Sequence, residues 1–183
     1  PSLVTEEGYF CQTFWPREGV GVFQDLDWQI EEVETELRAQ IEKVLKHVPH
    51  ASHLSGHMGL KQVDERIGTL YEKLETEYGL AVDVGAFAGF VGFGAESREL
   101  TPEEKTESLC ANLADMEPGK WIFVDHPAFD VAETRALGHL GYGGVAMDRE
   151  GVTRAWTDAR VLETIRERGI KLVSYADVKK GLA

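Results

Sequence analysis

The sequence predicts an α/β fold with a mainly parallel sheet, because helical and extended patterns alternate along most of the chain. Its 183 residues, 43% hydrophobic and 28% charged, are typical of a globular protein with one domain or at most two small ones. The formal charge of −13 argues against nucleic acid or an anionic membrane as a partner, since both favour clustered Lys and Arg. No apolar run approaches the roughly 18 residues of a membrane span.

The helices are expected where apolar residues recur every three or four positions or where capping residues are present. The first such segment carries Val33, Leu37 and Ile41 at helical spacing and ends before Pro49. A later one begins at Thr101, a good N-cap that Pro102 follows. The expected helices cover residues 30–47, 62–78, 101–116, 131–140, 158–168 and 177–182.

Short apolar runs between these helices predict strands at residues 51–54, 80–84, 121–124, 143–147 and 170–174. Residues 1–28 are expected to be irregular and to contribute aromatic anchors, among them Phe14, Trp15 and Trp28. Residues 85–94, in which glycines alternate with phenylalanines, are expected to form a mobile apolar loop that could cover a cleft.

Two histidines mark the candidate site, because each follows the end of a predicted strand. His57 comes after residues 51–54, and His126 after residues 121–124. The carboxyl ends of parallel strands meet at one edge of a sheet, so these imidazoles are expected to converge there. Neutral imidazole is a common ligand of zinc and other divalent metals. Packed or hydrogen-bonded structural histidines are the alternative interpretation.

Other residues near these positions are weaker candidates. His53 could be a third ligand or a catalytic group beside the metal, provided that the chain turns at Ser55 and Gly56. Met58, next to His57, is a candidate contact for substrate. Arg149 either forms a structural ion pair with its neighbour Asp148 or lies at the cleft to bind a polar substrate.

The remaining histidines and the cysteines indicate no further chemistry. His47 and His50 are expected to interact with the last carbonyls of a helix, and His139 is expected on the surface. The chain contains no nucleophile elbow and no phosphate-binding glycine loop. Cys11 and Cys110 are too few for a disulfide scaffold, which favours the reducing environment of the cytoplasm.

The stretches His53-Leu54-Ser55-Gly56-His57-Met58-Gly59 and Val124-Asp125-His126-Pro127 resemble the YdjC-like, or ChbG-type, carbohydrate deacetylase family. Weaker similarities lie at residues 1–10 and 36–42, before the first histidine motif, and at residues 169–177 near the end of the chain. Together with the two motifs they occur in the family's order, and the resemblance covers nearly the whole chain.

The resemblance implies a distorted (β/α) barrel of the TIM type that removes acetyl groups from N-acetylated sugars. One divalent ion, Zn²⁺ or Mg²⁺, would be held by an Asp and two His, and the matching positions are His57 and His126. In such a site the ion polarises the amide carbonyl and activates water, while a carboxylate takes the proton. A non-catalytic sugar-binding or scaffold protein, or a metal hydrolase of another amide or ester, are the alternatives. A second copy of the chain is a further candidate partner, since the aromatic segments offer apolar surface.

Two departures from the family pattern stand out. Ser55 occupies a position where the family usually has Asp, and nothing in the chain matches the Asp-Asp pair that supplies the family's metal carboxylate. The predicted strands are also too few to close a barrel of roughly eight. Residues 1–183 are therefore expected to form the C-terminal part of a single barrel domain that is incomplete at its N-terminus.

Overall fold

The computed structural model describes residues 2–11, 21–94, 97–138 and 141–182. These residues divide into two compact units. The first unit comprises Pro1–Asp83 together with Ser174–Leu182, and the second unit comprises Val84–Val173. A division of this kind can occur within one domain, so the expected single domain over 1–183 stays a prediction. The predicted anchors Phe14 and Trp15, and His139, lie outside the described residues.

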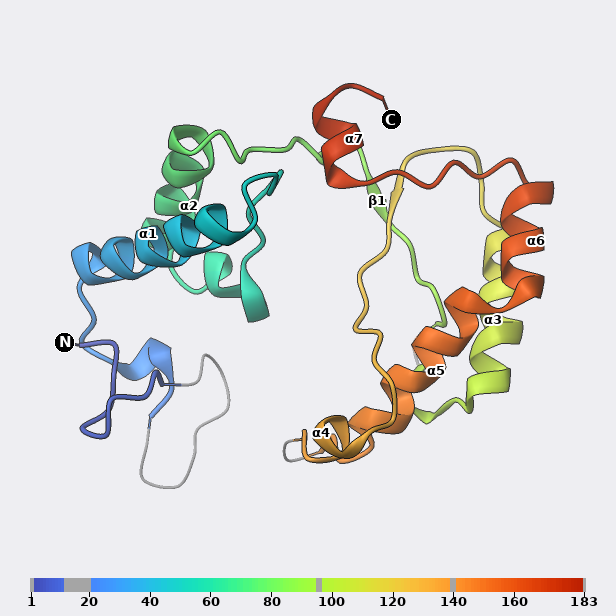
Figure 1. The fold of residues 1–183 in the computed structure, drawn as a ribbon, viewed down its shortest axis with the longest axis horizontal. Helices are drawn as coiled ribbons and strands as arrows, with labels where there is room; N and C mark the ends of the chain where they lie inside the picture. The colour runs from blue at the N-terminus through green and yellow to red at the C-terminus, as the bar shows by residue number, and fades with distance from the viewer. Residues whose placement is uncertain (1, 12–20, 95–96, 139–140, 183) are drawn as a thin grey trace. The chain divides into compact units, whose positions relative to one another are not determined.

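The first unit is built on two amphipathic helices that lie side by side, α1 (Ile30–His47) and α2 (Glu65–Glu77) (Figure 1). The sequence predicts the bounds of α1 correctly. α2 begins later than expected because the Asp64 side chain caps it, accepting a hydrogen bond of 2.8 Å from the Arg66 N–H. The buried faces of both helices meet Trp28, which stacks on Phe23 and confirms the expected aromatic anchor. The first unit also contains the short helices η1 (Phe23–Asp25), η2 (His57–Gln62) and α7 (Tyr175–Lys179).

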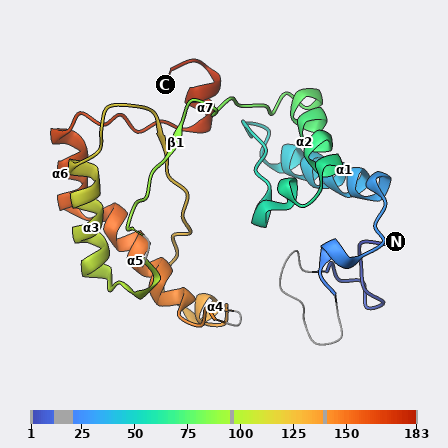
Figure 2. The same cartoon turned by 180° about the vertical axis from the view of Figure 1, so that it is seen from behind.

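The second unit packs three longer helices against one another (Figure 2), over a core of aliphatic and aromatic side chains. They are α3 (Pro102–Ala114), α5 (Val145–Thr157) and α6 (Ala159–Glu167). α3 starts at the predicted cap: the Thr101 hydroxyl accepts from the Glu104 N–H, and the Glu104 carboxylate accepts from the Thr101 N–H. Asp158 likewise caps α6, as the expected helix over 158–168 requires. The unit also holds η3 (Ser97–Glu99) and α4 (Ala132–Arg135), which is shorter than the helix expected over 131–140.

The expected strand over residues 143–147 is wrong, because this segment enters α5. Its alternation of small and apolar residues resembles a short strand. In the structure, however, Val145, Val152 and Ala155 are buried along one side of a helix that packs against α3. Contacts with residues distant in the sequence therefore override the local pattern.

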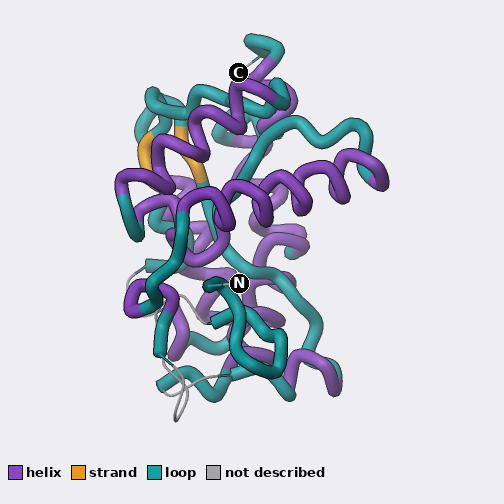
Figure 3. Tube along the Cα trace, turned by 90° about the vertical axis from the view of Figure 1, so that its left-hand side faces the viewer, coloured by secondary structure: helices purple, strands orange, loops and turns teal. Residues whose placement is uncertain are grey.

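The sheet of the second unit is small and parallel (Figure 3). β1 (Ala88–Gly89) pairs with β2 (Trp121–Ile122), with Ala88 opposite Trp121 and Gly89 opposite Ile122. β2 lies where a strand was predicted, whereas β1 lies within residues 85–94, where a loop was expected. The loop prediction is wrong at β1, because this strand forms only by pairing with β2. A glycine-rich sequence gives no local signal of such a distant partner.

Three other predicted strands, at residues 51–54, 80–84 and 170–174, have no regular ladder in the described part of the chain. One backbone hydrogen bond of 3.3 Å joins the Leu54 N–H to the Leu80 carbonyl. The described residues are thus a mostly helical α/β arrangement with a small parallel sheet, and the closed barrel stays a prediction. No helix among them is long and apolar enough to cross a bilayer.

A buried ion pair joins α3 to α5. The Lys105 side chain is 1% exposed, and its Nζ lies 2.7 Å from Oδ1 of Asp148. Nζ also donates to the Ser97 carbonyl, and the Tyr142 hydroxyl donates to the other carboxylate oxygen of Asp148. Gly151 makes room for the lysine stem, since a Cβ there would lie 2.7 Å from Cδ of Lys105. The buried charges are therefore paired and almost fully hydrogen-bonded.

We expect Asp148→Ala to lower the free energy of unfolding by about 3–5 kcal/mol, because it leaves the Lys105 ammonium buried without its partner. Chemical denaturation measures the change. Combining it with Lys105→Met should recover most of the loss. Glu103→Gln, which breaks an exposed ion pair with Arg160, is the matched control and should have a far smaller effect. Equal effects of the two single variants would contradict the importance of the buried pair.

Alkaline pH should destabilise the second unit through Tyr142. Burial and the hydrogen bond to Asp148 raise the pKa of this phenol from 10.0 to about 12. Its contribution to stability is complete below pH 10.0 and is lost as the pH rises through about 12. Tyr142→Phe should flatten this part of a plot of unfolding midpoint against pH. Tyr9→Phe, at a tyrosine that is 74% exposed, should leave the plot unchanged.

Candidate functional site

His57 lies exposed at the start of η2, in the first unit. The next residue, Met58, has φ 49° and ψ 36°, and Gly59 follows with φ 66°. Met58 is the one non-glycine residue with positive φ in the described part of the chain. Left-handed backbone is costly for a side chain such as methionine and is concentrated at functional loops. The chain therefore turns at the two residues that directly follow His57.

Gly56 allows the segment before His57 to pass close to α2. A Cβ at Gly56 would lie 3.3 Å from the Tyr71 hydroxyl, so a larger residue would press on this ring. Tyr71 is 7% exposed, and burial raises the pKa of its phenol. The turn at Ser55 and Gly56, on which a third ligand at His53 depends, is absent: the backbone at Gly56 is extended, with φ −79° and ψ 123°, and the chain turns only at Met58 and Gly59. The close approach of Gly56 to Tyr71 favours this extended passage beside α2.

His53 lies on the same segment and has well-defined contacts. Its ring stacks on Tyr175 with centroids 4.0 Å apart and planes at 18°. The Ser52 hydroxyl lies 3.1 Å from Nδ1 of His53. Lys179 donates a hydrogen bond of 3.2 Å to the Ser52 carbonyl.

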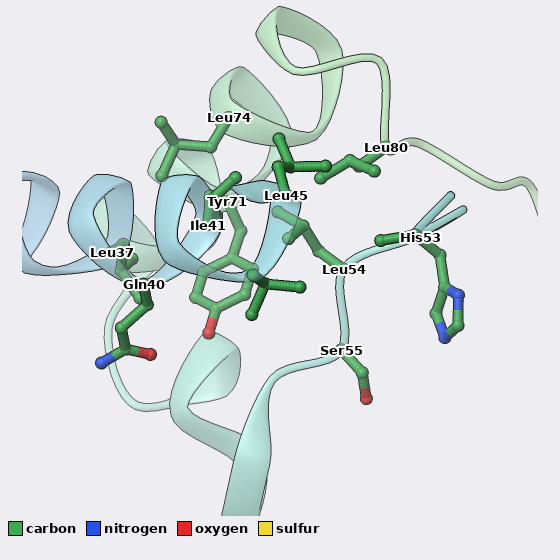
Figure 4. Close-up of a pocket in the computed structure, with 12 residues that line it drawn as sticks. Leu37, Gln40, Ile41, Leu45, His53, Leu54, Ser55, Tyr71, Leu74 and Leu80 are labelled. Atoms are coloured by element: carbon green, nitrogen blue, oxygen red, sulfur yellow. The ribbon is translucent and has the colours of Figure 1, made fainter. Parts of the chain in front are cut away.

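A pocket of about 200 Å³ opens beside this segment, between α1 and α2. In Figure 4 the aliphatic side chains of these helices gather over the segment, and the His53 imidazole points away from them. The pocket is lined by Leu37, Gln40, Ile41, Val44, Leu45, Ala51, His53, Leu54, Ser55, Tyr71, Leu74 and Leu80. Most of these side chains belong to the hydrophobic core of the first unit, so the pocket is largely an apolar gap in that core.

His126 is exposed in the second unit, on the loop that follows β2. Its backbone N–H donates a hydrogen bond of 2.7 Å to Oδ1 of Asp125. The Asp125 carboxylate therefore accepts from the backbone of His126.

Arg149 lies on α5, close to the loop of His126. The Arg149 carbonyl accepts a hydrogen bond of 3.2 Å from the Ala128 N–H, and the Thr153 hydroxyl donates to the Ala128 carbonyl at 2.9 Å. The ion pair of Arg149 with its neighbour, one of the two interpretations above, is wrong, because Asp148 pairs with Lys105. Nε of Arg149 is buried without a hydrogen-bond partner in the described structure. The second interpretation, contact with a polar substrate, stays a prediction.

The structure therefore groups the candidates by unit. His53, His57 and Met58 lie in the first unit, whereas His126 and Arg149 lie in the second, where the Ala128 N–H donates to the Arg149 carbonyl. Convergence of His57 and His126 stays a prediction. Among the described residues, no three His, Cys, Asp or Glu side chains converge on a common point. Exposed imidazoles fit a divalent ion by donor type, so each unit offers one ligand of the predicted kind.

Sequence reasoning missed Tyr175 and Lys179, which contact the segment of His53. The predicted helix began at residue 177, but α7 begins at Tyr175 because Ser174 and Asp177 form a capping box. That pattern could have placed the start of the helix. No local signal connects Tyr175 to a histidine so far away in the sequence.

Comparison with known proteins finds one matching family model and similar solved structures. Residues 1–167 match the family model described as YdjC-like protein. A crystal structure from Enterococcus faecalis, of a protein described as a proposed cellobiose-phosphate cleavage protein, aligns with a TM-score of 0.67 and 22% identity. The alignment covers 97% of this chain and 69% of that one, and at this identity it shows a shared fold alone. Among curated proteins, no match was found.

We expect the left-handed turn after His57 to tolerate glycine and reject a β-branched residue. Met58→Val should lower the free energy of unfolding by about 1–2 kcal/mol relative to Met58→Gly, because the branched side chain fits positive φ poorly. Urea denaturation of the two variants measures the difference. Equal stabilities would show that residue 58 is not held in this conformation.

Proposed function

This chain belongs to the YdjC-like family, and we propose that it acts as a metal-dependent carbohydrate deacetylase. The enzyme would hydrolyse the amide of an N-acetylated sugar or oligosaccharide to acetate and a free amine. Family membership supports a role in carbohydrate processing. The description of the Enterococcus faecalis neighbour, which refers to cellobiose phosphate, points to the same class of substrate.

The observation that carries the proposal is the exposure of His57 and His126 on fixed loops. Both imidazoles face solvent, and neither forms a hydrogen bond or ion pair within the described residues. Histidines kept for packing are usually hydrogen-bonded or buried. His57 is followed by the left-handed Met58, and His126 lies on a loop bonded to α5.

We assign His57 and His126 as ligands of one divalent ion, Zn²⁺ or Mg²⁺, in a distorted (β/α) barrel. The bound ion would supply Lewis-acid polarisation of the amide carbonyl and an acidified water. The family's Asp ligand has no counterpart in this chain, so a carboxylate from outside these residues would complete the site. We further propose a cytoplasmic location.

The other candidates have supporting roles in this proposal. His53 offers Nε2 for proton transfer or for a hydrogen bond to the site, since Nδ1 lies against Ser52. Arg149 would bind polar groups of the sugar. Met58 would contact the substrate next to His57.

Metal binding tests the assignment directly. We expect His57→Ala and His126→Ala each to weaken Zn²⁺ affinity by at least about 10- to 100-fold, the loss typical of even outer-shell changes at metal sites. Calorimetric titration of the full chain measures affinity. His50→Ala, at an exposed histidine beyond the end of α1, is the control and should bind as the parent does.

Acetate release from N-acetylglucosamine oligomers tests the reaction. Release that depends on His57 and His126 but not on His50 would support the deacetylase. Equal Zn²⁺ affinity in all three variants would refute the ligand assignment. Sugar binding without acetate release would favour a non-catalytic sugar-binding or scaffold protein. Metal-dependent hydrolysis of a different amide or ester would favour a metal hydrolase with another substrate.

A further inference from the structure

We propose that Tyr175 and Lys179 of α7 are positioning residues, which hold His53 and the segment leading to His57 in a fixed conformation. The inference rests on the proposed roles of these histidines and adds a part of the chain that the family match does not reach. That match ends at residue 167, whereas α7 covers Tyr175–Lys179.

Tyr175 fixes the plane of the His53 ring. The rings stack with centroids 4.0 Å apart and planes at 18°, and both side chains are half-buried. Stacked rings at this spacing restrict rotation about both side-chain torsions of a histidine. Ser52 lies 3.1 Å from Nδ1, so one nitrogen is occupied and Nε2 is the atom left for a ligand or a proton.

Lys179 fixes the backbone on which His53 stands. Its ammonium donates to the carbonyls of Ser52 and Gly79, and so connects the segment before His57 to the end of α2. Beside it, the Leu54 N–H donates to the Leu80 carbonyl at 3.3 Å. A segment without a regular ladder would otherwise open easily, because few hydrogen bonds resist its separation.

α7 can act in this way because its start is well defined. The Ser174 N–H and hydroxyl both donate to the Asp177 carboxylate, at 2.9 and 2.6 Å. A helix of this length is unstable in isolation, so packing on the first unit must support it. The contacts of α7 with residues 52–53 and 79 therefore stabilise both partners. They hold His53 in place, and they also keep the short helix α7 folded.

NMR of the His53 ring tests the stacking without requiring metal or activity. In the parent chain, the His53 ring protons should be shifted upfield by the Tyr175 ring, with assignment from His53→Gln. Tyr175→Ala should abolish this shift, and Tyr175→Phe should retain it because the ring is preserved. Unchanged His53 signals in Tyr175→Ala would overturn the proposal.

Hydrogen exchange tests the lysine. Lys179→Met should accelerate exchange of the Leu54 amide, whereas Lys180→Met, at the exposed neighbouring lysine, should not. This pair keeps the proposal testable even if Tyr175→Ala fails to fold. Equal exchange in the two variants would contradict a role for Lys179.

Zn²⁺ titration separates positioning from a merely structural contact. Tyr175→Ala should weaken affinity by about 10-fold or more, and Tyr175→Phe should restore it. Loss of the upfield shift with unchanged affinity would overturn the positioning role. If the parent chain bound no Zn²⁺, the proposed function would fail, while the ring shift and amide exchange would still decide whether α7 holds the segment.

Discussion

The buried ion pair between Lys105 and Asp148 controls how the second unit packs. A charge taken out of water costs several kcal/mol unless a partner and hydrogen bonds replace the solvent, so α3 and α5 can approach only where these groups meet. Gly151 and the Ser97 carbonyl complete the arrangement, since one makes room for the lysine stem and the other accepts from its ammonium. Arg149, next to Asp148 on α5, then binds the loop of His126 through its carbonyl. The candidate site in this unit therefore depends on a contact made elsewhere in its core.

In the first unit, side chains and not a sheet hold the segment that carries the candidate histidines. The segment that leads to His57 is predicted as a strand, but it has no regular ladder in the described structure. Tyr71, on α2, packs against Gly56, while Tyr175 and Lys179 hold the segment from the C-terminal end of the chain. A rigid support matters here, because a metal ligand or a proton donor acts only when its ring is held in the productive orientation.

Much of the helical structure could be predicted because its signals are local. The apolar spacing within α1, and the caps at Thr101 and Asp158, each act over a few residues. The candidate histidines could likewise be found from their neighbours along the chain. β1 was missed and residues 143–147 were misassigned as a strand, because pairing and burial there depend on segments far apart in the sequence.

The sequence by itself determined the bounds of α1, the best-capped helices and the histidine motifs that indicate the family. Each of these is encoded by residue type and spacing over a short stretch. Only the tertiary structure decided that Asp148 pairs with Lys105 and not with Arg149, and that Tyr175 stacks on His53. The physical reason is that a charged group buried in the core needs an opposite charge buried beside it, as Asp148 has in Lys105. Likewise, His53 stacks on the ring that tertiary packing brings next to it. In both contacts the partner lies far away in the sequence, so the residues near Asp148 or His53 do not predict it.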